Sequence, residues 1–115
     1  MDKRKHPRAA FRCSVTVWRN GETTRLNAYT KNLSLEGVCV VLQDELAINE
    51  EVRLQIDLGD SLPPLTSQAK VVWTLAYRLD EPPIQSTTRY QTGFHFTDLS
   101  GTDRARIEKM VSQRA

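Results

Sequence analysis

Apolar side chains recur at every second position along most of this chain. Such alternation is typical of β-strands that bury one face and expose the other. In the segment CSVTV, for example, Cys13, Val15 and Val17 share one parity, and the residues between them are polar. Residues 38–42 (VCVVL) are apolar throughout, which indicates a central strand. The alternating segments are residues 11–17, 23–31, 52–58, 67–76 and 90–96.

Turn signals separate several of these predicted strands. Asn20-Gly21 predicts a tight hairpin, because both central residues of a primed turn need positive φ. The stretch RLDEPPIQSTT (residues 78–88) is polar and interrupted by prolines, so we expect a surface loop there, before the last strand. One parity of the strand over residues 67–76 carries Ala69, Val71 and Trp73.

Only the C-terminal segment changes period. In SGTDRARIEKMVSQ, the apolar residues Ile107, Met110 and Val111 fall at the helical spacing i, i+3 and i+4. This predicts an amphipathic helix over about residues 101–113, whose start either Ser100 or Thr102 can cap. Short antiparallel strands need closure to protect their edges. We therefore expect an all-β fold, a six-stranded antiparallel β-barrel with a C-terminal α-helix.

Positive charge is concentrated at the N-terminus. Residues 1–12 hold five Lys and Arg residues and one acidic residue, whereas the whole chain of 115 residues holds 16 basic and 14 acidic residues. A protein that coats a nucleic acid spreads its cations over a whole face, so this layout favours a small anionic partner and no nucleic acid. The length suits one domain. We expect a mobile basic arm over residues 1–12 and a barrel over residues 13–115.

Composition also bears on location. No segment approaches the roughly 20 apolar residues that span a bilayer, and the basic start MDKRKHPR lacks the apolar run of a secretory signal after it. We therefore expect a cytoplasmic location and no membrane insertion. Cys13 and Cys39 both lie in apolar stretches, and in the cytoplasm we expect two reduced core thiols.

Signals for catalysis and metal binding are sparse. The only histidines are His6, in the basic arm, and His95, which alternates with two phenylalanines and should face solvent. Nucleophilic catalysis needs a Ser or Cys beside a positioned His, and a metal site needs more ligands than these. The chain also has no Gly-rich loop that could cradle a phosphate. We expect a binding module, not an enzyme, without a cofactor or metal.

Two short motifs stand out against this background. In RKHPR (residues 4–8), two arginines are four positions apart, and NLSLEG (residues 32–37) joins the second predicted strand to the third. They resemble the RxxxR and (D/N)xSxxG motifs of the PilZ domain family, whose members bind cyclic di-GMP. The segments KVVW, GFHF and TDLSGTDRARIEKMV also look like the corresponding PilZ segments, so the resemblance covers nearly the whole chain. It implies the same antiparallel barrel.

The resemblance further implies that cyclic di-GMP is the ligand. The planar fork of arginine can bind a phosphate bidentately, pair with guanine O6 and N7, or stack on a purine. Asn32 and Ser34 can each donate and accept a hydrogen bond, and Gly37 can let the backbone approach a base closely or adopt positive φ. The ligand contacts implied in this way are Arg4, Arg8, Asn32, Ser34 and Gly37, with Lys3 as an additional candidate.

Alternatives stay open at this point. The arm can be a solvated tail near acidic residues such as Asp44, and residues 32–37 can be an Asx or Ser turn that needs no ligand. A PilZ-like barrel can also serve as a protein-interaction module with an idle nucleotide site. In the favoured hypothesis, cyclic di-GMP orders the arm across the barrel, and the complex signals to a downstream protein effector.

Overall fold

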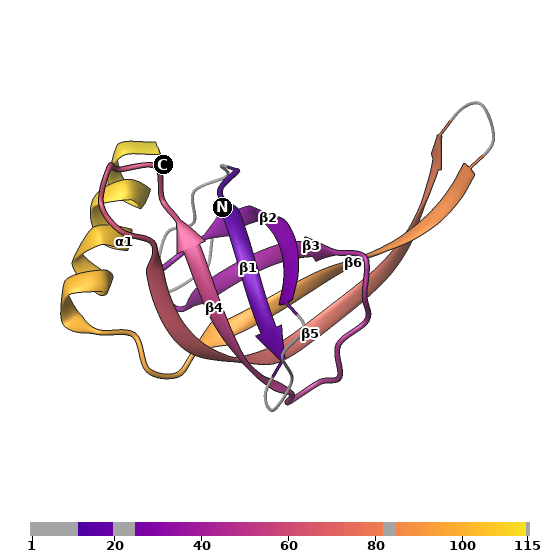
Figure 1. Ribbon diagram of the computed structural model, residues 1–115, viewed down its shortest axis with the longest axis horizontal. Coiled ribbons are helices and arrows are strands. Elements are labelled where there is room, and N and C mark those ends of the chain that lie inside the picture. The colour runs from indigo at the N-terminus through magenta and orange to yellow at the C-terminus, as the bar shows by residue number, and fades with distance from the viewer. Residues whose placement is uncertain (1–11, 20–24, 82–84, 115) are drawn as a thin grey trace, which may run out of the picture.

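The six predicted strands close into one antiparallel barrel. The computed structural model describes residues 12–19, 25–81 and 85–114. Neighbouring strands follow the order β1-β2-β3-β6-β5-β4, and β4 pairs with β1 to close the barrel (Figure 1). The all-β prediction and the strand count are confirmed. The elements are β1 (Ser14–Arg19), β2 (Arg25–Leu33), β3 (Gly37–Leu42), β4 (Glu51–Asp57), β5 (Leu65–Glu81), β6 (Gln85–Phe96) and α1 (Gly101–Arg114).

Alternation along the strands fills the barrel interior. On β4, Val52, Leu54 and Ile56 are completely buried, whereas the residues between them lie on the outer face. Burying one such aliphatic side chain contributes about 1.5–3 kcal/mol, so the inward parity of every strand is strongly specified. Cys13 and Cys39 are buried, as expected, and neither forms a disulfide.

The predicted loop over residues 78–88 is wrong. β5 continues to Glu81 and β6 begins at Gln85, and the ladder pairs Arg78 with Thr88 and Glu81 with Gln85. The two strands form a ribbon that extends beyond the barrel (Figure 1). Polar composition misled the prediction, because a ribbon outside the core needs no buried face, and its backbone groups can pair between the two strands.

A bulge in β5 reverses the facing of its central residues. The β5–β6 register shifts between Val71 and Trp73, so Val72 is the additional residue. Val71 is buried, whereas the Trp73 side chain is 37% exposed on the outer face. The expectation that Trp73 shares a face with Val71 is therefore wrong, because an inserted residue shifts the two-residue period by one position.

The C-terminal helix covers one end of the barrel, opposite the β5–β6 ribbon (Figure 1). The Ser100 Oγ caps its start by accepting a hydrogen bond from the Asp103 N–H at 3.1 Å. Ile107, Met110 and Val111 are buried against the core, which confirms the predicted amphipathic spacing. The described part of the chain contains no helix long and apolar enough to cross a membrane.

The predicted Asn20-Gly21 turn lies outside the described residues. The strands on either side of it pair antiparallel, with Trp18 opposite Arg25.

Candidate functional site

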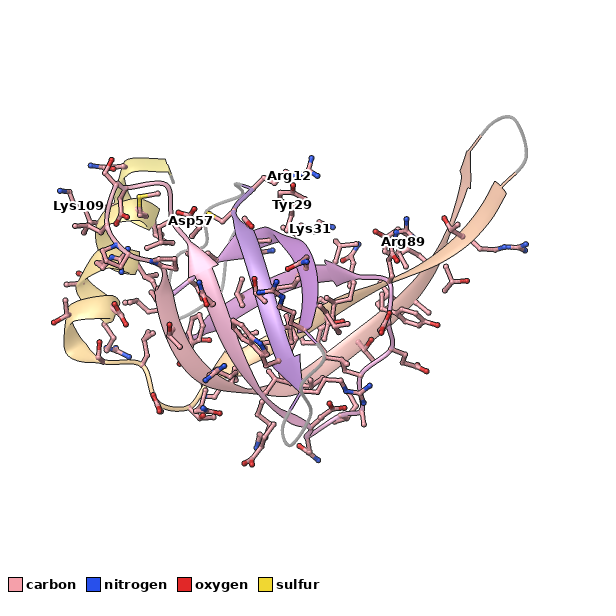
Figure 2. All side chains as sticks on the ribbon, in the orientation of Figure 1. Arg12, Tyr29, Lys31, Asp57, Arg89 and Lys109 are labelled. Carbon is pink, nitrogen blue, oxygen red and sulfur yellow. The ribbon has the colours of Figure 1, made fainter. Side chains whose placement is uncertain are left out.

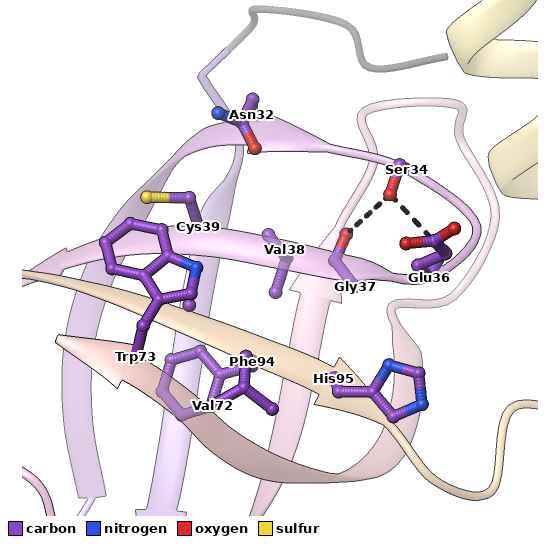
Figure 3. A pocket seen from close by; sticks show the side chains of 11 residues that line it. Asn32, Ser34, Glu36, Gly37, Val38, Cys39, Val72, Trp73, Phe94 and His95 are labelled. Carbon is purple, nitrogen blue, oxygen red and sulfur yellow. Dashed lines mark hydrogen bonds between the residues drawn. The ribbon is translucent and has the colours of Figure 1, made fainter. Parts of the chain in front are cut away.

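The segment that joins β2 to β3 is held by Ser34. This side chain is 5% exposed, and its Oγ accepts a hydrogen bond from the Glu36 N–H at 3.2 Å (Figure 3). The Ser34 N–H donates to the Gly37 carbonyl oxygen at 2.9 Å, and the Oγ lies 3.5 Å from the same oxygen. Two short-range bonds and a long contact thus fix a compact Ser turn between the strands.

Gly37 is required by the neighbouring strand. It pairs with His95 on β6, and a Cβ at this position would overlap the Phe94 carbonyl oxygen. Among the described glycines only Gly59 has positive φ, so positive φ, one of the two roles predicted for Gly37, is not found. The close neighbour of Gly37 in the structure is the backbone of β6, which lies where any larger side chain would stand, and the predicted approach to a base stays a prediction.

A pocket of about 110 Å³ opens beside this turn on the outer face of the barrel (Figure 3). The ladder registers explain its composition, because Asn32 pairs with Cys39, Cys39 with Gly93, and Gly93 with Trp73. Residues that pair directly across a sheet share a face, so four strands contribute to one wall. The lining residues are Asn32, Ser34, Glu36, Gly37, Val38, Cys39, Val72, Trp73, Gly93, Phe94 and His95.

Trp73 forms the aromatic side of the pocket. Its indole packs over Gly93, and a Cβ on residue 93 would overlap the indole Nε1. The buried Cys39 side chain lies beside the same ring (Figure 3). Trp73 was not among the predicted site residues. The available signal was the doublet Val71-Val72, which breaks the alternation just before the tryptophan.

The pocket offers polar groups of mixed type. Asn32 is half-buried, and none of the hydrogen bonds between described residues uses its side-chain amide. That amide can therefore donate to and accept from a ligand. Glu36 and His95 are exposed at the rim. The described residues include no group of three or more His, Cys, Asp or Glu residues placed to hold a metal ion.

The sequence profile described as PilZ domain matches residues 2–113. The chain belongs to the PilZ domain family. Comparison with curated proteins finds no match.

Several solved structures share this fold. The PilZ domain of YcgR from Escherichia coli with c-di-GMP superposes with a TM-score of 0.78 and 14% identity, over 98% of this chain and 92% of that chain. The Bacillus subtilis inhibitor of motility, MotI, gives 0.73 and 19% identity over 99% of this chain and 51% of its own. The K. pneumonia MrkH–c-di-GMP complex superposes with a TM-score of 0.74 and 19% identity, over 98% of this chain and 52% of the MrkH chain. This PilZ domain thus spans about half of the last two chains.

The structure brings three of the predicted PilZ site residues together. Asn32, Ser34 and Gly37 line one pocket. The other three candidates are Lys3, Arg4 and Arg8, which lie outside the described residues. The assignment of all six to a ligand stays a prediction.

Proposed function

We propose that this PilZ domain is a cytoplasmic cyclic di-GMP receptor that binds its ligand without catalysis and signals to a partner protein. The observation that carries the proposal is the pocket in which Asn32, Ser34 and Gly37 meet an exposed indole. Membership of the PilZ domain family supports it. The related structures of the YcgR PilZ domain and of MrkH also hold c-di-GMP.

One guanine would lie in the pocket. A volume of about 110 Å³ is far below the 300–1,000 Å³ of pockets that enclose a drug-sized ligand, so most of the dinucleotide would stay outside. The Asn32 amide can bond to a guanine edge, and the exposed ring of Trp73 offers a face for stacking. Stacking of a base on an aromatic side chain contributes about 1–3 kcal/mol.

The phosphates would be bound by the N-terminal arm. Arg4 and Arg8 each carry a guanidinium that can bind a phosphodiester bidentately or stack on the second guanine. Lys3 adds a third positive charge, which can act only as a point charge. Because the ligand is a dianion, the cations of the arm would contact its phosphates, and the neutral side chains of the pocket would contact a base.

Binding would order the arm across the barrel. Residues 1–8 carry four basic groups and no apolar side chain between Met1 and Pro7, so without ligand this part of the arm would repel itself and would have little to pack against. Ordering about five residues costs roughly 1–2 kcal/mol each, which offsets part of the contact energy. Micromolar affinity, about −8 kcal/mol, is the expected result, and such a ligand can be released when its concentration falls.

Isothermal titration of the whole chain with cyclic di-GMP tests the proposal. Wild type should bind with micromolar affinity, and Arg8→Ala should weaken binding far more than Lys5→Ala, a matched change of an arm cation outside the motif. Absence of binding at tens of micromolar ligand would refute the receptor assignment. The alternative would then be a protein-interaction barrel with an idle nucleotide site.

A further inference from the structure

A second concave surface lies on the outer face of β2, β3 and β6, away from the Ser34 turn. It is a groove of about 520 Å³ with three cations and no acidic residue in its lining. We call Arg12, Tyr29, Lys31 and Arg89 the basic-aromatic surface; three of these side chains extend from the top of the barrel in Figure 2, and Arg89 lies toward the ribbon. The lining residues are Arg12, Asn27, Ala28, Tyr29, Thr30, Lys31, Val41, Gln43 and Arg89.

Arg12 is held in a receptive orientation. Its guanidinium carbon lies 4.0 Å from the centroid of the Tyr29 ring, and Tyr29 itself is 51% exposed. A guanidinium that stacks on an aromatic ring uses its flat face, so the N–H donors at its edge stay available for a carboxylate or another anion. The stack also reduces the rotamer freedom that Arg12 would otherwise lose on binding.

The three cations lack counter-charges in the described part of the chain. Arg19 and Arg106, by contrast, form ion pairs, with N–O distances of 2.6 Å to Glu50 and 3.0 Å to Asp60. No ion pair between described residues involves Arg12, Lys31 or Arg89. Clustered cations repel one another, and an anion that occupies the groove would relieve this repulsion.

A row of side chains that is apolar except for Gln91 crosses the sheet next to these cations. Tyr29 pairs with Val41, Val41 with Gln91, and Gln91 with Leu75, so all four share the outer face. Leu75 is 56% exposed. The row lies one step along the strands from the row that holds Asn32 and Trp73, so the groove adjoins the candidate nucleotide pocket without sharing its lining.

We propose that the basic-aromatic surface binds an acidic, partly apolar segment of a partner protein. Carboxylates would pair with Arg12, Lys31 and Arg89, and apolar side chains would lie along the row from Tyr29. A nucleic acid fits less well, because residues 13–115 hold 11 basic and 13 acidic residues and would repel a phosphate backbone outside the groove. The inference rests on the proposed function, since a receptor without catalysis must act through a partner.

Amide chemical-shift mapping tests the surface without any nucleotide. The probe is a synthetic peptide in which Asp and Glu alternate with Leu, titrated into the labelled whole chain at physiological salt. It should shift amides at Arg12, Tyr29, Lys31 and Arg89. The same peptide with Lys in place of its acidic residues should shift none of them. An oligothymidylate of similar length should bind more weakly than the acidic peptide.

Charge reversal supplies the matched comparison. Arg12→Glu should weaken binding of the acidic peptide at least tenfold. Arg53→Glu is the matched control, because Arg53 also stacks on an aromatic ring, with its guanidinium carbon 4.5 Å from the Trp18 centroid. Arg53 lies on β4, outside the basic-aromatic surface, so this substitution should leave binding of the acidic peptide unchanged. Equal effects of the two substitutions, tighter binding of the oligothymidylate, or no shift at the surface would each overturn the proposal. The peptide assay contains no nucleotide, so failure of this proposal would appear as lost or unselective peptide binding. Failure of the receptor assignment would appear separately, as absence of binding when cyclic di-GMP is titrated into wild type and Arg12→Glu.

Discussion

Trp73 lies directly opposite Gly93 in the β5–β6 ladder, and its indole occupies the space that a side chain at residue 93 would need. The pair depends on the bulge at Val72, which turns the tryptophan from the core to the outer face. A glycine in the middle of a strand normally weakens it. At this position it lets an aromatic ring lie flat against the sheet and form one side of the candidate pocket.

Gly93→Ala should displace the indole and weaken cyclic di-GMP binding about tenfold, the equivalent of losing one stacked base. In a Trp18→Phe background Trp73 is the only tryptophan, and its emission should shift to the red as the ring becomes more exposed. Gly101→Ala is the control, because a Cβ there meets nothing within 4 Å. Unchanged emission and affinity in Gly93→Ala would show that the ring position does not depend on this glycine.

Arg8→Ala should weaken cyclic di-GMP binding most among the arm substitutions, and Arg4→Ala should follow. Loss of a charge-assisted contact costs about 1.5–3 kcal/mol, which corresponds to a 10- to 150-fold rise in Kd. Thermal stability should stay within about 0.5 kcal/mol of wild type, because the arm is expected to lie outside the core. Calorimetric titration and thermal melts measure the two effects. If Arg8→Ala binds like wild type, the site assignment is wrong.

Ser34→Ala should destabilise the fold by about 1 kcal/mol. The substitution removes the acceptor of the Glu36 N–H in the turn between β2 and β3, and the loss of one neutral hydrogen bond has about this effect. Urea denaturation gives the value. Ser14→Ala is the control, because Ser14 lies on β1 with its side chain exposed. A Ser34 variant as stable as the Ser14 variant would contradict the structural role of this hydroxyl.

Gly37→Ala should destabilise the protein by about 3 kcal/mol, the upper range for steric overlap in packed regions. The added methyl group would overlap the Phe94 carbonyl oxygen, and a backbone atom in a ladder cannot move aside as a flexible side chain can. Denaturation midpoints compared with Gly101→Ala give the difference. A small effect would mean that β3 and β6 can separate locally at low cost.

The ion pair between Arg19 and Glu50 should make stability depend on pH. Hydrogen bonding from Arg19 lowers the pKa of the Glu50 carboxyl below its ordinary value, and the Ala47 N–H adds to this effect. Because the folded-state pKa lies below the unfolded one, the pair stabilises the fold at neutral pH, and this contribution is lost as pH falls through the lowered pKa.

Glu50→Gln should therefore be less stable than wild type at about pH 7, by about 1 kcal/mol for a partly exposed pair, and the two should converge as pH falls through the lowered pKa of Glu50. Urea denaturation over a series of decreasing pH values measures this. Glu51→Gln, which changes an exposed neighbour on β4, should show no such convergence.

Prediction from sequence succeeded where burial sets the pattern. The alternation of Val52, Leu54 and Ile56 predicts an inward face, and the spacing of Ile107 and Met110 predicts a helix, because both patterns reflect contact with one core. The same rule cannot locate a bulge, so it placed Trp73 on the wrong face. It also cannot recognise a ribbon outside the core, where polar residues 78–88 carry no burial signal.

The candidate site was predicted only in part, for a related reason. Asn32, Ser34 and Gly37 are adjacent in sequence and were recognised as a motif. Trp73 and Gly93 reach the same pocket through ladder registers, which no local pattern contains. Gly37 itself was assigned to close approach or positive φ, but the partner that approaches it is β6, far away in the chain.

The connectivity of the barrel also bears on the order in which it assembles. β5 and β6 are consecutive in sequence and joined by only three residues, as are β2 and β3, whereas β1 and β4 pair directly although β2 and β3 lie between them in the sequence. Short loops close at lower entropic cost, so local pairings precede distant ones along a folding pathway. The ladder that carries Trp73 and Gly93 is therefore expected in the folding nucleus, and the seam between β1 and β4 forms last. Substitutions in the hairpin would then change the folding rate, and those along the seam the unfolding rate.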